Sequence, residues 1–162
     1  MHTKCSPSRA ALLTGRYAWT LGRQRGAIER YQPAGLTTRV SLLPGLLQQV
    51  GYQTHAVGKW HLGESPCRSQ SRAFRAYSCW LFKILTSIIT AGYCHPSYLP
   101  TRRGFQTFFG MWQQSTDYRT RMVTCSSIKF SRDQIGYDLR RNETVSRDYS
   151  NMFSTSMYAK VT

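Results

Sequence analysis

The stretch CSPSRAALLTGRY, residues 5–17, determines how the N-terminal part of this chain can fold. Ser6 is a good N-cap residue, and Pro7 suits the first position of a helix. The apolar run over residues 10–13 favours continuation of that helix. Gly15 then supplies the left-handed conformation at which helices commonly end. The stretch therefore predicts a short helix that is closed by a glycine.

Cys5 lies directly before this predicted helix. The first backbone N–H groups of a helix lack partners within it, and its dipole places positive charge at that end. Arg9 follows one turn later and adds a fixed positive charge. The sequence therefore predicts that Cys5 faces a pocket for an anion.

A second informative segment predicts a helix over 42–50 followed by a buried strand over 52–58. A helix, a tight turn and a strand in this order are typical of α/β proteins, which place functional residues at the carboxyl ends of strands. Lys59 stands at that position. Lys59 and His61 flank Trp60, so strand alternation would place them on one face. We therefore expect an α/β fold with functional residues near the end of this strand.

The composition describes a basic, folded chain. The 162 residues allow one domain, and 41% hydrophobic with 13% aromatic residues argues against disorder. Lys and Arg number 22 against 7 Asp and Glu, a net charge of +15, which is also typical of nucleic-acid binders. The basic residues are scattered, however. Only Glu29 is acidic among the first 63 residues, so a cation site built wholly from this stretch is not expected.

The cysteines and apolar segments exclude several classes. The five cysteines show no CxxC and no zinc spacing, and their odd number leaves at least one unpaired in a monomer. The four residues before Cys5 are too few for a signal peptide. The most apolar run, residues 79–94, is interrupted by Lys83 and is shorter than the roughly 20 residues of a membrane helix. We expect no membrane segment.

Two motifs together resemble the sulfatase family. CSPSRAALLTGR is similar to the first sulfatase signature, and GYQTHAVGKWHLG (51–63) is similar to the second. Cys5 precedes Lys59 by 54 residues, which fits the family order. LPTRRGFQTFFG (99–110) further resembles the arylsulfatase B group, which removes 4-sulfate from N-acetylgalactosamine in dermatan and chondroitin sulfate. The resemblance implies an alkaline-phosphatase-like α/β sandwich with a mixed sheet, incomplete here, with residues 1–162 forming part of the N-terminal catalytic domain.

The same resemblance implies roles for four residues. Cys5 would be oxidised to formylglycine, whose hydrated aldehyde attacks the sulfur of a sulfated sugar or an aryl sulfate. Arg9 would hold the formylglycine. Lys59 would bind a sulfate oxygen. His61 would hydrogen-bond the diol and assist its proton transfer.

The sequence departs from the family at the metal site. The family binds calcium through an Asp-Asp pair upstream of the cysteine and an Asp-Asn pair far downstream, with the formylglycine at Cys5 as a further ligand. Neither pair occurs in this sequence. We therefore expect a fragment that is inactive and poorly folded alone.

Other features concern processing. Residues 64–92 have no counterpart in the family pattern, and we expect them to be an insertion such as a retained intron. Asn142 begins a glycosylation sequon, which matters only in a secreted protein. The family implies a lysosomal or secreted location, and the formylglycine-generating enzyme as a partner. Without a signal peptide this chain would not meet that enzyme.

Three alternative readings remain open from the sequence. The arginine excess fits a non-catalytic protein that binds sulfated glycans or nucleic acid, although the two motifs disfavour nucleic acid. A translated pseudogene remnant is a second alternative. A phosphatase is a third, because related folds cleave phosphate esters.

Overall fold

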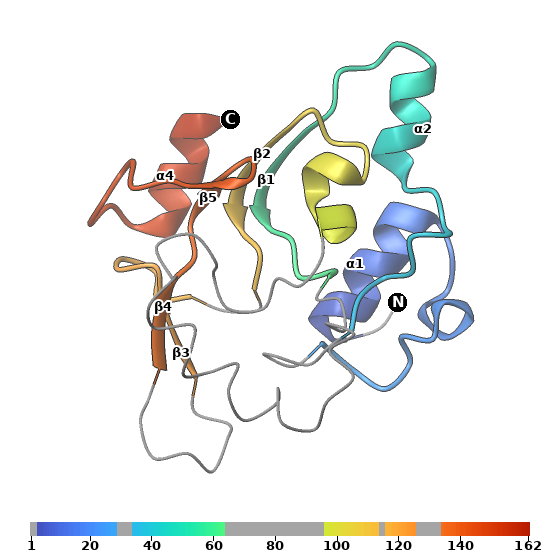
Figure 1. Cartoon of the computed structure of the whole chain (residues 1–162), viewed down its shortest axis with the longest axis horizontal. Helices are drawn as coiled ribbons and strands as arrows, with labels where there is room; N and C mark the ends of the chain where they lie inside the picture. The colour runs from blue at the N-terminus through green and yellow to red at the C-terminus, as the bar shows by residue number, and fades with distance from the viewer. Residues whose placement is uncertain (1–2, 29–33, 64–95, 114–115, 126–133) are drawn as a thin grey trace.

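The described part of the chain forms a mixed β-sheet with helices on both sides (Figure 1). The computed structural model describes residues 3–28, 34–63, 96–113, 116–125 and 134–162. Its helices are α1 (Cys5–Thr14), α2 (Leu43–Gln49) and α4 (Ser154–Val161), with 3-10 turns η1 (Ala18–Leu21), η2 (Pro96–Tyr98) and η3 (Pro100–Arg102). Its strands are β1 (His55–Lys59), β2 (Thr107–Met111), β3 (Met122–Cys125), β4 (Gln134–Tyr137), β5 (Arg140–Arg141) and β6 (Thr144–Val145).

The larger sheet has the strand order β1-β2-β5-β6. β1 and β2 are parallel, with Lys59 opposite Met111, while β5 pairs antiparallel with β2. The parallel pair brings the carboxyl ends of β1 and β2 to one edge. Gly58 and Gly110 face each other in this pair, and a Cβ on Gly110 would lie 1.8 Å from the Gly58 carbonyl oxygen. β3 and β4 form a separate antiparallel pair.

β2 connects two hydrophobic clusters. Successive side chains of a strand point to opposite faces, so Phe108 and Phe109 enter different clusters. Phe108 packs with residues from α1 and the end of β1, including Ala10 and Trp60. Phe109 packs with Leu139 and with residues of α4. The sheet therefore lies between α1 and α2 on one side and α4 on the other (Figure 1).

The predicted first helix is confirmed, but its start differs by two positions. α1 begins at Cys5 and has Lys4 as its N-cap, with no side-chain capping bond. The expectation that Ser6 is the N-cap is therefore wrong, and Cys5 belongs to the first turn. Gly15 ends the helix as expected, with φ 66° and its N–H donating to the Ala11 carbonyl over 2.9 Å.

The second predicted helix and strand are confirmed with small shifts at their ends. The helix covers residues 43–49, and the strand covers 55–59 and ends at Lys59. The strand is less buried than expected, because His55 and Val57 are exposed. The proposed insertion at 64–92, with Cys67 and Cys79, lies outside the described residues, as does Cys94.

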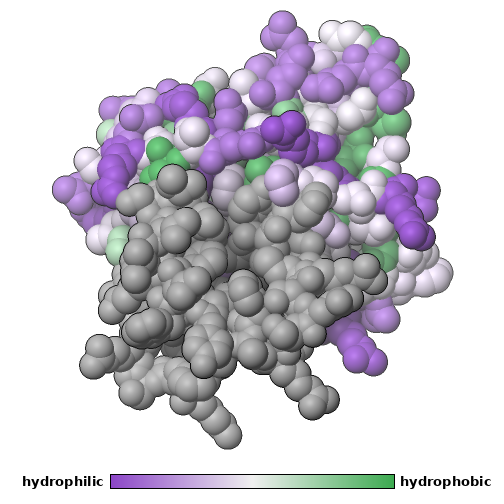
Figure 2. Space-filling model, viewed as in Figure 1, coloured by the Kyte–Doolittle hydropathy of each residue, from purple (hydrophilic) through white to green (hydrophobic). Residues whose placement is uncertain are grey.

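The surface in Figure 2 is mostly hydrophilic, and hydrophobic side chains reach it over the part that holds α2. Leu43, Leu46 and Val50 are exposed there and recur at helical spacing. Among the described helices, none has the length and apolar character needed to cross a membrane.

Candidate active site

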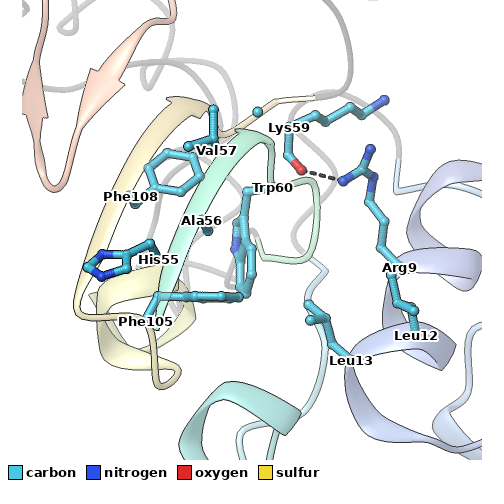
Figure 3. Close-up of a pocket in the computed structure, with 11 residues that line it drawn as sticks. Arg9, Leu12, Leu13, His55, Ala56, Val57, Lys59, Trp60, Phe105 and Phe108 are labelled. Carbon is cyan, nitrogen blue, oxygen red and sulfur yellow. Dashed lines mark hydrogen bonds between the residues drawn. The ribbon is translucent and has the colours of Figure 1, made fainter. Parts of the chain in front are cut away.

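Three predicted residues meet where α1 begins and β1 ends. Cys5, the first residue of α1, is exposed and carries a free thiol. Lys59, the last residue of β1, donates a side-chain hydrogen bond to the Cys5 sulfur. Arg9 lies one helical turn from Cys5 and donates through Nη1 to the Lys59 carbonyl oxygen (Figure 3). The fold therefore joins the two sequence motifs around the cysteine.

The electrostatics of this group favour an anion. Burial lowers the pKa of the Lys59 ammonium, while the hydrogen bond to Cys5 acts in the opposite direction. Burial also lowers the pKa of the Arg9 guanidinium, with Cys5 as the opposing influence. Arg9 and Lys59 are half-buried, and among the described residues no carboxylate contributes to either pKa. A negative group bound beside Cys5 would stabilise both cations.

His61 reaches the same helix turn by a different route. Its φ of 52° turns the chain after β1, and the side chain is buried. His61 Nε2 lies 2.7 Å from the Ile28 carbonyl oxygen, and its Nδ1 lies 3.3 Å from Ser6 Oγ. Because a carbonyl can only accept, Nε2 carries the proton and Nδ1 accepts from the Ser6 hydroxyl.

Ser6 and Ile28 complete a ring of hydrogen bonds with His61. The Ile28 N–H donates to Ser6 Oγ over 3.0 Å, so the hydroxyl both accepts and donates. Burial is the main cause that lowers the pKa of His61 to about 4, so its ring is neutral at physiological pH. Ser6 lies next to Cys5 in the chain, and the ring therefore fixes the turn that carries the cysteine. Sequence reasoning missed both Ser6 and Ile28.

A cavity of about 270 Å³ lies between α1 and β1 (Figure 3). Arg9 and Lys59 line one end, where the Arg9 guanidinium comes up from α1 to the Lys59 carbonyl. The remainder is mainly apolar and includes Leu13, Trp60 and Phe108. The cavity can therefore accept a group that is anionic at one end and apolar at the other.

The described residues do not form a calcium site. Calcium takes six to eight oxygen ligands, mainly carboxylates and carbonyls. The side chains around Cys5 are a thiol and two cations, and the part of the chain that is described holds no group of three His, Cys, Asp or Glu residues suited to a metal. No catalytic step is therefore assigned to a metal here.

The proposed glycosylation site, Asn142, lies in the exposed turn between β5 and β6. Its Oδ1 accepts from the Phe108 N–H over 2.9 Å, and its own N–H donates to the Phe108 carbonyl over 2.7 Å. Its φ is 55°. The side chain thus holds the turn against β2, and its glycosylation stays a prediction.

Comparison with known families identifies the class of protein that this fold and site define. The sulfatase family model matches residues 1–160. Arylsulfatase J of Mus musculus is 36% identical over 157 residues, which cover 96% of this chain and 21% of that protein. N-acetylgalactosamine-6-sulfatase of Canis lupus familiaris is 46% identical over 69 residues, 38% of this chain and 13% of that protein. The chain belongs to the sulfatase family, and it spans about a fifth of the length of Arylsulfatase J.

Solved structures agree on the fold. The crystal structure of Ps i-CgsB is similar with a TM-score of 0.64 and 22% sequence identity, covering 97% of this chain and 29% of that one. A second structure, of Ps i-CgsB in complex with k-i-k-neocarrahexaose, has the same TM-score and 21% identity. The expected alkaline-phosphatase-like α/β fold with a mixed sheet is confirmed, in partial form.

Proposed function

We propose that this chain carries the nucleophile and part of the sulfate-binding site of a formylglycine-dependent sulfuric ester hydrolase. The observation that carries the proposal is the meeting of Cys5, Arg9 and Lys59 in a member of the sulfatase family. A helix N-terminus and two cations around a modifiable cysteine suit a sulfate ester, which is anionic at the reacting end.

The chemistry begins when the formylglycine-generating enzyme, using dioxygen as oxidant and a thiol reductant, converts the Cys5 side chain to an aldehyde. The carbon–sulfur bond breaks and the sulfur leaves as hydrogen sulfide, while the other oxygen atom of dioxygen becomes water. The aldehyde then adds water to form a geminal diol. One hydroxyl oxygen attacks the sulfur of the ester, and the bond from sulfur to the alcohol oxygen breaks, so that the alcohol leaves with a proton. The second hydroxyl then loses its proton, its electrons reform the C=O bond, and sulfate departs. An unmodified thiol has no second hydroxyl with which to expel the sulfate. We therefore assign the oxidised Cys5 as nucleophile.

Lys59 and Arg9 act on charge and position in this scheme. The Lys59 ammonium, which already reaches the Cys5 sulfur, would bind a sulfate oxygen and offset negative charge as the ester bond breaks. Arg9 would hold the modified cysteine and, through its bond to the Lys59 carbonyl, the end of β1. His61 would contact the diol and move its proton, which requires the ring to exchange Ser6 or Ile28 for the diol.

The finer features of the function follow the family. The substrate would be a sulfated glycosaminoglycan sugar, as the arylsulfatase B-like motif indicates, and the location would be lysosomal or secreted. Calcium would require carboxylates beyond the described residues, so we propose that residues 1–162 alone turn over no substrate. The favoured alternative is a non-catalytic binder of anionic polymers, because the chain has a net charge of +15.

Conversion of Cys5 tests the proposal directly. The chain is produced together with the formylglycine-generating enzyme, and the peptide that contains Cys5 is analysed by mass spectrometry. We expect conversion from thiol to aldehyde. Absence of conversion, while a control peptide with the same signature is converted, would overturn the assignment.

Sulfate binding tests the role of Lys59 in the unconverted chain. Iodoacetamide alkylates Cys5, and we expect sodium sulfate to slow this reaction by occupying the site. Lys59→Ala should remove that protection, whereas Lys160→Ala, at an exposed position of α4, should retain it. Equal protection in both variants would contradict a sulfate site at Lys59.

A further inference from the structure

Two aromatic side chains stand in solvent just beyond α1. Tyr17 is 72% exposed and Trp19 is 67% exposed, and their rings stack with centroids 6.0 Å apart and planes 15° from parallel. The backbone beneath them is fixed, because Ala18 and Leu21 of η1 are buried and Gly22 closes the turn with φ 66°. We call Tyr17 and Trp19 the aromatic platform. Large exposed apolar surfaces of this kind commonly mark binding sites.

The described segment that holds the aromatic platform is basic. Arg16 is exposed directly before Tyr17, and Arg23 follows the turn, with its N–H bonded to the Ala18 carbonyl over 2.8 Å. Residues 3–28 contain five Lys and Arg and no Asp or Glu. Within the described part of the chain, Arg16 and Arg23 take part in no ion pair. The ligand of the platform is therefore expected to be anionic.

We propose that the aromatic platform binds a sulfated sugar unit of a polysaccharide. This inference rests on the proposed function. The C–H face of a sugar ring would pack on the outer face of Tyr17 or Trp19. Sulfate groups would accept hydrogen bonds from Arg16 and Arg23, since guanidinium forks match planar and tetrahedral oxyanions well.

The ring geometry argues against insertion of a nucleic acid base between Tyr17 and Trp19. A base inserted between the two rings would require a centroid separation of two stacking distances, about 6.8 Å. The rings are 6.0 Å apart and already stack on each other, so only their outer faces and edges accept a ligand. A sugar or a base can each pack on one such face, and the sulfated substrate of the proposed function favours the sugar.

The platform lies apart from Cys5 but beside the same helix. Leu21 of η1 shares a core cluster with Ala10 of α1. Ala10 is five residues beyond Cys5, about 7.5 Å along the helix axis. The chain after α1 runs back beside this helix in Figure 1. A small aryl sulfate held at Cys5 would therefore leave the platform empty, whereas a polysaccharide is long enough to extend beyond Cys5.

Binding of the 162-residue chain to chondroitin sulfate tests the proposal. We expect Trp19→Ala to weaken binding about tenfold and Trp19→Phe to restore most of it, because stacking needs only an aromatic face. Arg16→Ala should reduce the dependence of affinity on salt. The matched control is Tyr118→Ala, because Tyr118 is 62% exposed and stacks on Phe153 with centroids 5.5 Å apart.

The outcomes separate this inference from the proposed function. The proposal would be overturned if Trp19→Ala bound chondroitin sulfate as tightly as the wild type. It would also be overturned if Tyr118→Ala lost as much affinity as Trp19→Ala. If Trp19→Ala lost binding to single-stranded DNA while its binding to chondroitin sulfate was unchanged, the surface would be assigned to nucleic acid. That result would also overturn the proposal. If Cys5 fails to convert but Trp19→Ala still weakens binding to chondroitin sulfate, the platform is retained and the proposed enzyme is lost.

Discussion

Acidification should destabilise the fold through His61. Burial holds the pKa of this ring at about 4 in the folded chain, below its ordinary value of 6.5. A base whose pKa is lowered by folding binds its proton more readily in the unfolded chain. The free energy of unfolding is therefore highest above pH 6.5, where the ring is neutral in both states, and it falls as the pH drops towards 4. Since a tenfold change in an equilibrium corresponds to about 1.4 kcal/mol, the full loss is about 3 kcal/mol, and about 2 kcal/mol is lost by pH 5.

Urea unfolding of the wild type and of His61→Gln at pH 7.5 and 5 measures this loss. The glutamine amide retains an N–H donor for Ile28 but does not titrate, so the variant should lose about 2 kcal/mol less than the wild type between the two pH values. Burial raises the pKa of Asp138, which acts in the opposite sense, and comparing the two proteins removes that contribution. His55→Gln, at an exposed position, is the control.

The reasoning would be refuted if His61→Gln retained the pH dependence of the wild type. Side-chain NMR gives an independent measurement that needs no variant. In the wild type we expect the His61 ring to remain singly protonated, at Nε2, down to pH 5. Titration of that ring near pH 6.5 would also contradict the described burial.

Two further perturbations test the packing around the site. Ser6→Ala leaves the Ile28 N–H and His61 Nδ1 buried without their hydroxyl partner. We expect it to lower the free energy of unfolding, measured with urea at pH 7.5, by about 2 kcal/mol. Unchanged stability would show that these hydrogen bonds do not stabilise the fold. A cooperative thermal transition of the wild-type chain would overturn the expectation that it is poorly folded alone. Gly110→Ala should abolish that transition, because its Cβ would lie 1.8 Å from the Gly58 carbonyl oxygen. Gly15→Ala meets no atom within 4 Å and should cost only about 1 kcal/mol of left-handed strain; equal effects of the two glycine variants would contradict the described strand contact.

Local signals in the sequence were sufficient for α1 and for the place of Lys59. The helix around Ala10 and its end at Gly15 depend on residues within a few positions of each other, so propensity and capping predict them. Lys59 follows a β-branched and aromatic segment and precedes a turn. Its meeting with Cys5, in contrast, was expected only from the family resemblance, since 54 residues separate the two.

The role of Ser6 could not be predicted locally. Its hydroxyl contacts Ile28 and His61, which are 22 and 55 residues away, and a serine before a proline looks the same whether it caps a helix or not. α4 also carries little local signal, because no side chain caps its start and it has only eight residues. Packing of Met157 against Phe109 and Leu139 gives that helix its place.

The adjacent phenylalanines of β2 have a consequence for how the molecule opens. Because Phe108 and Phe109 belong to different clusters, neither cluster can separate from the sheet without disturbing the strand that supports the other. Partial opening of either side should therefore be suppressed, and the amide protons of β2 should exchange with solvent only when both sides unfold together. The end of β1 that presents Lys59 is paired with this strand, so the site shares its slow exchange and remains assembled until the whole described unit unfolds.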